Sequence, residues 1–368
     1  MMAAKKTIRV LIVDDSALTR KILREILSSD PDIEVIGTAM DPYIARTKIK
    51  QLNPDVLTLD VEMPKMDGIS FLKNLMRLRP MPVVMVSSLT QKGADVALEA
   101  LGQGAVDYVG KPDVSSDTSL ADYSEEIISK IKMAASIHQI PNTAARQPDP
   151  AAYTSNNQTA ALIRRKNDQV IVVIGASTGG TEAIKEILIR LQPDSYSVIV
   201  VQHIPSAFST AFAERVNKIS SLEVCEAGDN QKILPGHVYI APGDKHLKIV
   251  RDGSAGPYYC KLDDSAPVNR HKPSVDVLFR SVCASAGSNA IGILLTGMGS
   301  DGALGLKEIH DTGAITIAQD EQSSVVWGMP GEAVKLQAAN FILPLDKIAN
   351  KVTTLVKQPT DKNVISSS

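Results

Sequence analysis

The chain alternates short apolar runs with amphipathic stretches of helical period, first over residues 8–137 and again from residue 170 onward. Such alternation is typical of doubly wound parallel sheets, in which helices make right-handed crossovers between strands. In the first block we expect strands at residues 8–13, 33–37, 55–59, 82–87 and 105–109, and helices at residues 18–27, 43–52, 69–78, 94–101 and 123–137. These elements predict an α/β domain with five parallel strands.

The second block carries strand candidates at residues 170–174, 198–201, 290–295 and 314–317. Its middle section, residues 222–262, differs because β-like runs at 237–241 and 247–250 are separated by Pro-Gly and Asp-Gly turns. Such turns favour hairpins. We therefore expect a second doubly wound, mostly parallel α/β sheet with an antiparallel hairpin region beside it.

A change in composition separates the two blocks. Residues 139–167 are rich in Pro, Ala, Asn, Gln and Thr and show no sustained period, which is typical of a linker. We expect one domain at residues 1–138, the linker at 139–167, a second domain at 168–357 and a disordered tail at 358–368.

The overall composition excludes several classes of protein. A net charge of −2 and an aromatic content of 4% speak against a nucleic-acid partner, as does the lack of a basic stripe. The three cysteines have no CxxC spacing, which fits a reducing compartment better than a disulfide framework or a zinc site. No apolar run approaches the roughly 18 residues of a membrane span. We expect a cytoplasmic protein with no membrane insertion.

Acidic side chains gather at the strand ends of the first block. Asp14 and Asp15 follow the first strand, Asp60 ends the third, Ser87 ends the fourth and Lys111 follows the fifth. Ligand sites in such sheets lie beyond the carboxyl ends of the strands. Carboxylates gathered there repel one another unless a hard cation such as Mg²⁺ binds them, and one could then attack a phosphoryl group. A lone Asp is more often a helix cap or turn residue, but that interpretation does not explain why polar side chains occur together at the ends of four strands.

The motifs VDDS, DVEMPKMDG, VSS and YVGKP give this block a resemblance to the flavodoxin-like receiver domain of two-component response regulators. The resemblance implies that Asp60 is the phosphorylated residue. It implies Mg²⁺ as the cofactor of phosphorylation, held by Asp14, Asp15, Asp60 and the backbone carbonyl of Glu62. Ser87, Tyr108 and Lys111 match the positions that relay phosphorylation to one face of the domain.

The second block begins with a strand that leads into a serine-containing loop, QVIVVIGASTGGT, and then into a helical pattern. Ser177 stands between Gly175 and Gly179, in a loop that presents a side chain at the carboxyl edge of a sheet. An esterase-like nucleophile is one interpretation. A phosphate-binding or purely structural turn is the other, because glycine motifs of this kind have many false positives.

Two further strand ends supply partners for Ser177. His203 follows the next strand and is the candidate general base, and Asp301 follows a later strand in LLTGMGSDG. Asp301 would either cap the following helix or accept Nδ1–H of His203 and orient it. Backbone N–H groups at Met298 and Thr178 are the candidate oxyanion donors. The order Ser, His, Asp differs from that of α/β-hydrolases, so the serine loop is not their nucleophile elbow.

This block resembles the catalytic domain of chemotaxis protein-glutamate methylesterases through IGASTGG, VQHIP, YIAPGDKHL, RHKPSVDVLF and LLTGMGSDGALGLK, and through a Gln-Asp followed by WGMP. The resemblance implies a Ser-His-Asp hydrolase that demethylates glutamate methyl esters on chemoreceptors, releases methanol and deamidates receptor glutamines. No cofactor is expected for that reaction. The implied partners are methyl-accepting receptors as substrates and a chemotaxis histidine kinase as phosphodonor, with phosphorylation relieving coverage of the catalytic cleft by the receiver.

Two alternatives of other classes stay open at the level of the sequence. A receiver fused to a nucleic-acid-binding output would need a helix-turn-helix pattern, and none is seen. A receiver-controlled binding or scaffold module could use GASTGG for a nucleotide, although the loop lacks the GxGxxG spacing and a matching ribose-binding acid.

Overall fold

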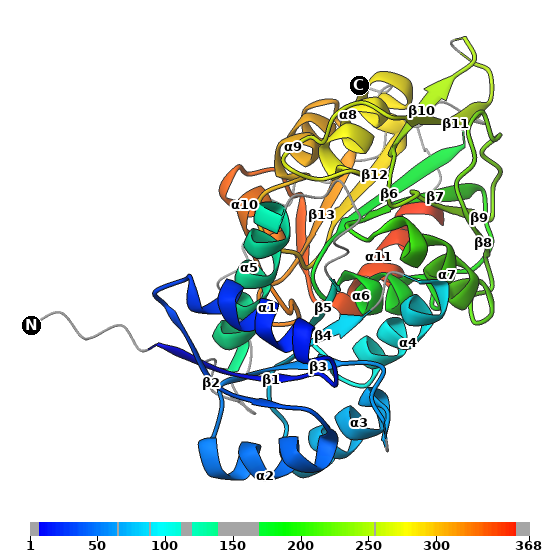
Figure 1. Ribbon diagram of the computed structural model, residues 1–368. Coiled ribbons are helices and arrows are strands. Elements are labelled where there is room, and N and C mark those ends of the chain that lie inside the picture. The colour runs from blue at the N-terminus through cyan, green and yellow to red at the C-terminus, as the bar shows by residue number, and fades with distance from the viewer. Residues whose placement is uncertain are drawn as a thin grey trace, which may run out of the picture. The chain divides into compact units, whose positions relative to one another are not determined.

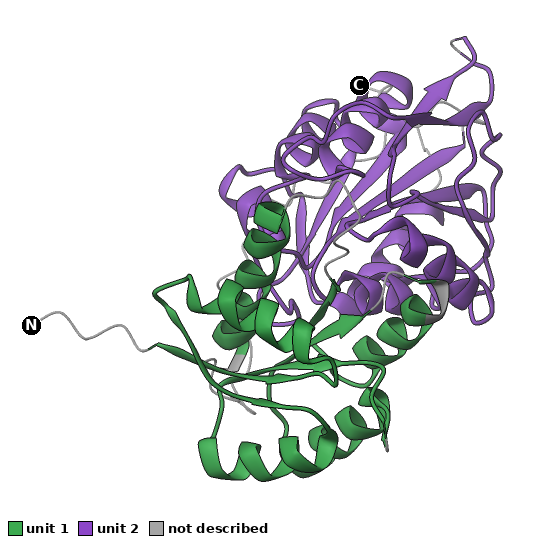
Figure 2. Ribbon diagram, viewed as in Figure 1, with its two compact units in different colours: residues 1–146 green, residues 147–368 purple. Residues whose placement is uncertain are grey.

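The computed structural model describes residues 7–64, 66–87, 90–111, 120–138, 169–253 and 255–357 (Figure 1). The chain divides into two compact units, Met1–Arg146 (unit 1) and Gln147–Ser368 (unit 2) (Figure 2). The expected linker at 139–167 and the expected tail at 358–368 lie outside the described residues.

Unit 1 is built on a five-stranded parallel sheet with the strand order β2-β1-β3-β4-β5. The strands are β1 (Ile8–Val13), β2 (Ile33–Ala39), β3 (Val56–Asp60), β4 (Val83–Ser87) and β5 (Asp107–Gly110). The helices are α1 (Ala17–Ser28), α2 (Pro42–Leu52), α3 (Gly68–Leu78), α4 (Gln91–Gly102) and α5 (Leu120–His138). The predicted doubly wound sheet is thus confirmed.

Helices cover both faces of this sheet, and its central strands β3 and β4 are buried along their whole length. Figure 1 shows α1 and α5 on one side and α2 and α3 on the other. One core cluster joins Val10 and Ile12 of β1 to Leu27 of α1 and Ile127 of α5. Val10 and Ile12 are two residues apart and therefore face the same side of the sheet. Buried on both faces, the sheet leaves only its edges for polar chemistry.

Unit 2 contains a seven-stranded sheet in the order β14-β13-β12-β6-β7-β9-β8, and every neighbouring pair is parallel. Its strands are β6 (Val170–Ala176), β7 (Tyr196–Gln202), β8 (Glu223–Glu226), β9 (His237–Ile240), β12 (Ala290–Leu294), β13 (Ile315–Gln319) and β14 (Phe341–Leu343). The helices are α6 (Gly180–Leu188), α7 (Ser206–Asn217), α8 (Val275–Ser285), α9 (Ala303–Asp311), α10 (Met329–Lys335) and α11 (Leu345–Lys357), with a 3₁₀ turn at Gly287–Asn289.

The antiparallel hairpin consists of β10 (His246–Arg251) and β11 (Tyr258–Asp263) and forms a separate two-stranded sheet. Residues 237–241 were expected in the hairpin region, but β9 pairs in parallel with both β7 and β8. This part of the expectation is wrong because a short apolar run beside a Pro-Gly turn looks the same in either setting. The hairpin packs over α8 and shares a core with the large sheet through Leu247, Ile249 and Cys260.

Both sheets have a point at which the direction of winding reverses. In unit 1 it lies between β1 and β3, and in unit 2 it lies between β6 and β12. The connections that follow the two strands at such a point run to opposite faces of the sheet, which leaves a crevice for a ligand beyond the carboxyl ends. Each unit thus has one preferred place for a site.

Candidate active site and phosphorylation site

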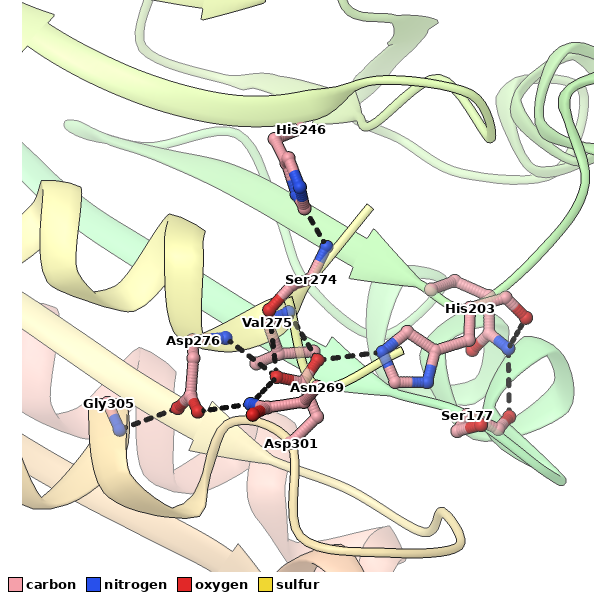
Figure 3. A network of polar contacts seen from close by, with 10 residues as sticks. Ser177, His203, His246, Asn269, Ser274, Val275, Asp276, Asp301 and Gly305 are labelled. Carbon is pink, nitrogen blue, oxygen red and sulfur yellow. Dashed lines mark hydrogen bonds and ion pairs between the residues drawn. The ribbon is translucent and has the colours of Figure 1, made fainter. Parts of the chain in front are cut away.

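The pairing of β6 with β7 brings Ser177 and His203 together. Ala176 is the register partner of Gln202, so the next residue on each strand is Ser177 or His203. The N–H of His203 donates to the carbonyl of Ala176 at 3.1 Å. The side-chain amide of Gln202 donates to the carbonyls of Ser177, at 2.8 Å, and His203, at 3.2 Å (Figure 3). The two loops are therefore tied together through their backbones.

The loop after β12 packs directly against the serine loop. The N–H of Ser177 donates to the carbonyl of Thr296 at 3.0 Å, so this N–H group is already used and does not suit an oxyanion. A Cβ added at Gly297 would lie only 2.8 Å from Cβ of Ser177. Glycine is therefore required where this loop passes the nucleophile. Met298, a candidate oxyanion donor, is the residue that follows Gly297 in this loop.

Asp301 binds His203, as expected, but through the other ring nitrogen. Nε2 of His203 lies 2.9 Å from Oδ2 of Asp301, whereas the prediction from the sequence placed Nδ1 in that contact. The reason is the direction from which the ring enters, because His203 comes from β7 while Asp301 comes from the loop after β12. Asp301 also does not cap α9, since Gly302 occupies that position.

The imidazole is therefore arranged as a base directed away from Asp301. An ionised carboxylate only accepts hydrogen bonds, so Nε2 carries the proton and Nδ1 carries the lone pair. Nδ1 is buried and has no hydrogen-bond partner among the described residues. Figure 3 shows the ring between Asp301 and Ser177. No hydrogen bond joins Ser177 Oγ to the ring in the part of the chain that the structure describes. Such contacts are often open before substrate binds.

Asp301 is held as an anion by several donors. Its carboxylate accepts hydrogen bonds from Ser274 Oγ at 2.8 Å, from the N–H of Val275 at 2.7 Å and from Asn269 Nδ2 at 2.8 Å. Burial opposes ionisation of Asp301, but the hydrogen bond from His203, the attraction to the His203 ring when it is protonated, and the other donors outweigh it. The pKa of Asp301 therefore lies well below its ordinary value, and the carboxylate stays charged while it orients the base.

A second histidine covers the first. The rings of His203 and His271 stack with centroids 3.7 Å apart and planes 6° from parallel. Together with Asp301, these side chains form a group whose ligand atoms lie within 4.8 Å of one another. Lone pairs of stacked rings run parallel in their own planes, so they do not converge on one ion. The arrangement suits a held imidazole better than a metal centre.

The acidic cluster of unit 1 forms at its own switch point. Ligand oxygens of Asp14, Asp15 and Asp60 lie within 4.8 Å of one another. Lys111 Nζ lies 2.8 Å from Oδ2 of Asp60 and 3.5 Å from Oδ2 of Asp14. Burial raises the pKa of Asp60 to about 6, with the nearby charge of Asp14 adding to the shift and Lys111 opposing it. Burial likewise raises the pKa of Asp14.

These residues fit a bound Mg²⁺. Oδ2 of Asp14 is buried and accepts no hydrogen bond among the described residues, which leaves a carboxylate oxygen aimed into the cluster. Carboxylate oxygens are the ligands that Mg²⁺ prefers. Glu62, whose backbone carbonyl was expected as a further ligand, lies in the β3–α3 loop, and its N–H donates to Oδ1 of Asp60 at 3.2 Å. The single positive charge of Lys111 does not balance the three negative charges of Asp14, Asp15 and Asp60, which favours a bound cation.

The expected switch residues lie on the neighbouring strands. Ser87 ends β4, and its hydroxyl donates to the carbonyl of Gly93 at 3.2 Å. Tyr108 is buried in β5, with Lys130 Nζ 5.2 Å from the centre of its ring and donating to its carbonyl at 2.6 Å. Lys111 follows β5 and points its ammonium group at Asp60.

Comparison with known proteins identifies the family. The model of the family described as "CheB methylesterase" matches residues 172–352, and that of the "Response regulator receiver domain" matches residues 10–119. A relative from Hydrogenovibrio crunogenus is 53% identical, covering 95% of this chain and 99% of its own length. The chain belongs to the CheB methylesterase family.

That relative is named "Protein-glutamate methylesterase/protein-glutamine glutaminase". A relative from Xanthomonas campestris, with the same name followed by the number 1, is 54% identical over 97% of this chain and 99% of its own length. The crystal structure of the Thermotoga maritima CheB methylesterase catalytic domain is 37% identical and covers 51% of this chain and 99% of that chain, with a TM-score of 0.49. Within the described residues, no helix has both the length and the apolar character of a membrane span.

For this member of the CheB family, several residues around Ser177, His203 and Asp301 were not predicted from the sequence. Gln202, Asn269 and Ser274 each hold part of it through hydrogen bonds. Ser274 carried a signal, since a serine just before an apolar helical pattern is a common helix start. Gln202 and Asn269 carried none, because nothing in their spacing points toward Ser177 or Asp301.

Proposed function

We propose that this chain is a phosphorylation-regulated hydrolase that demethylates glutamate methyl esters on chemoreceptors and deamidates specific receptor glutamines. The observation that carries the proposal is the His203 ring, which lies between Asp301 and Ser177 and whose unprotonated Nδ1 has no hydrogen-bond partner among the residues that the structure describes (Figure 3). The names of its relatives, protein-glutamate methylesterase/protein-glutamine glutaminase, support the choice of substrate.

In the proposed reaction, Ser177 Oγ attacks the ester carbonyl and gives its proton to Nδ1 of His203. Asp301 holds the resulting imidazolium through Nε2–H. Backbone N–H groups at Thr178 and Met298 are the proposed donors to the oxyanion. Methanol leaves with the proton from His203, and ammonia leaves instead when the substrate is a glutamine. Water then hydrolyses the glutamyl-serine ester, with His203 again as base.

We further propose that residues 1–138 act as a receiver domain and residues 168–357 as the catalytic domain, joined by the linker at 139–167. Asp60 would accept the phosphoryl group, and Asp14, Asp15, Asp60 and the carbonyl of Glu62 would hold Mg²⁺. When bound, Mg²⁺ would offset the charge of the phosphoryl oxygens. Lys111 would pair with the new phosphate, and Ser87 and Tyr108 would respond to it and relieve inhibition of the catalytic domain.

The proposed partners follow from this chemistry. The substrates would be methylated helices of methyl-accepting chemotaxis receptors, and a chemotaxis histidine kinase would donate the phosphoryl group. These helices lie on the cytoplasmic side, so we place the action of the chain in the cytoplasm. Neither nucleic acid nor membrane insertion has a role in the proposal.

Methanol release from methylated receptor, with and without a small phosphodonor and Mg²⁺, tests the proposal. We expect release from the wild type that increases with the phosphodonor, and no release from Ser177→Ala. Asp60→Asn should retain unstimulated release and lose the stimulation. Normal release by Ser177→Ala would overturn the catalytic assignment, whereas equal rates for Asp60→Asn and the phosphorylated wild type would overturn the regulation.

A further inference from the structure

A tight turn just before α8 carries a side chain into the catalytic network. Val268 and His271 exchange two backbone hydrogen bonds, at 3.0 and 2.9 Å, around the central residues Asn269 and Arg270. Both central residues have positive φ, 52° and 67°. That is the pattern of a type I′ turn, in which Asn and Gly are favoured because L side chains strain this backbone.

The amide of Asn269 joins two buried carboxylates. Nδ2 donates to Oδ2 of Asp276 at 2.7 Å and to Oδ1 of Asp301 at 2.8 Å (Figure 3). A primary amide has two N–H groups, so each carboxylate receives one. Both carboxylates are 1% exposed. Without a donor between them, two buried anions would face each other across this gap.

Asp276 links this bridge to two helices. It lies in the first turn of α8, and its Oδ1 accepts a hydrogen bond from the N–H of Gly305 in α9 at 2.7 Å. Burial, and the charge of Asp301, raise the pKa of Asp276, while the hydrogen bonds from Gly305 and Asn269 oppose the shift. Arg280 is the cation whose charge acts on both carboxylates. Asp276 is thus a second carboxylate behind the one that orients His203.

We propose that Asn269 is a positioning residue for the hydrolytic reaction, because its amide fixes the Asp301 carboxylate by sharing it with Asp276. The proposal rests on the proposed function of Ser177, His203 and Asp301. Asp301 Oδ2 faces His203 and its Oδ1 faces Asn269, so a change at Asn269 alters the angle at which the carboxylate meets the ring. Base orientation matters in the transition state more than in substrate binding.

Asn269→Gly removes the side-chain amide and leaves the turn intact, because glycine adopts positive φ without strain. Arg270→Gly is the matched control, since it makes the same change at the other central position. Methanol release with methylated receptor is measured for both variants. We expect Asn269→Gly to lower kcat about tenfold or more with KM changed by less than about twofold, as for loss of a hydrogen bond to a charged group. Arg270→Gly, which leaves the Asn269 amide in place, should lose much less kcat than Asn269→Gly.

Asn269→Asp gives a second readout, because it replaces the donor by a third carboxylate. Asp276 and Asp301 contact this position directly. Around them, His203 binds Asp301, His271 stacks on His203, and the charge of Arg280 acts on both carboxylates. Three carboxylates in contact take up a proton more readily than two, and that proton restores one donor. The activity deficit of Asn269→Asp relative to the wild type should therefore be larger at pH 8.5 than at pH 6.

The outcomes separate this proposal from the proposed function. A wild type without methanol release would remove the proposed function itself. With an active wild type, the positioning role is overturned by a wild-type kcat in Asn269→Gly, by an equal loss in Arg270→Gly, or by a loss that appears in KM alone. An Asn269→Asp deficit that does not change with pH would also overturn it.

Discussion

Asp60 and Asp301 occupy equivalent places in two sheets and have opposite electrostatic surroundings. Asp60 ends β3 and Asp301 lies in the loop after β12, the strands that border the switch points of their units, and each is 1% exposed. Among the described residues, Asp301 accepts hydrogen bonds from four groups besides His203, and its pKa is lowered. Asp60 has Lys111 and one N–H group but also faces Asp14, and its pKa is raised to about 6.

The contrast shows how one fold principle serves two kinds of chemistry. When the protein itself supplies the hydrogen-bond donors of a carboxylate, the carboxylate stays charged without a bound cation. It can then only orient and stabilise a neighbouring base. A carboxylate short of donors and close to another carboxylate favours a cation from solution. The protein therefore balances the charge of Asp301 with its own donors, whereas the charge around Asp60 is left for a bound cation to balance.

Asp301→Asn should give the largest effect on activity. The amide keeps the shape of the side chain but cannot hold His203 in the tautomer with Nε2 protonated, so methanol release should fall by about 10⁴-fold. Phosphorylation of Asp60 by a small phosphodonor should be unchanged, because the substitution lies in the other unit. A variant that keeps more than about a tenth of the wild-type rate would remove Asp301 from the catalytic role.

Removal of Mg²⁺ tests whether the site of Asp60 needs a cation that the site of Asp301 does not need. With excess EDTA, phosphorylation of Asp60 by a small phosphodonor should slow by about 100-fold or more, because the carboxylates then repel the incoming phosphoryl group. Unstimulated methanol release should be unaffected. The two rates are measured on the same sample, by acyl-phosphate formation and by methanol release. An equal fall in both would mean that the two sites do not differ in their need for a cation.

Two glycines, one beside each site, allow each site to be disturbed separately by added steric bulk. A Cβ at Gly68 would lie 2.1 Å from the carbonyl oxygen of Asp60, and a Cβ at Gly297 would lie 2.8 Å from Cβ of Ser177. Gly297→Ala should displace the serine loop and lower methanol release by up to about 100-fold, with phosphorylation intact. Gly68→Ala should do the reverse. If either substitution impaired both activities equally, the loss would reflect general unfolding rather than a local shift.

The sequence predicts the parts of this arrangement that depend on apolar patterning. Buried runs such as residues 8–13 and 170–174 mark the central strands, and parallel pairing then brings Ser177, His203 and Asp301 to one edge. The tautomer of His203 was not predictable, because it depends on the direction from which two loops approach. Asn269 was not predictable either, since its reach to Asp301 requires a turn with two positive φ angles and no glycine.

The smallest effects are expected on stability, and they compare the electrostatic surroundings of Asp60 and Asp301 most directly. In metal-free buffer, Asp60→Asn should raise the free energy of unfolding by about 1 kcal/mol, because it removes one of several repelling buried charges. Asp301→Asn should lower it by about 2 kcal/mol, because it removes an anion that its donors stabilise. Scanning calorimetry of the full chain would show the midpoint shifts in opposite directions.

The cost of Asp301→Asn should also not become smaller between pH 8 and pH 5. A carboxylate whose folded pKa is lowered contributes stability that is fully present above its unfolded pKa, which is ordinarily near 3.8, and that is lost only as the pH falls through the folded value. Both measurements lie above that window. If the cost shrank at pH 5, Asp301 would be taking up a proton there, and its donors would not keep it charged as the geometry requires.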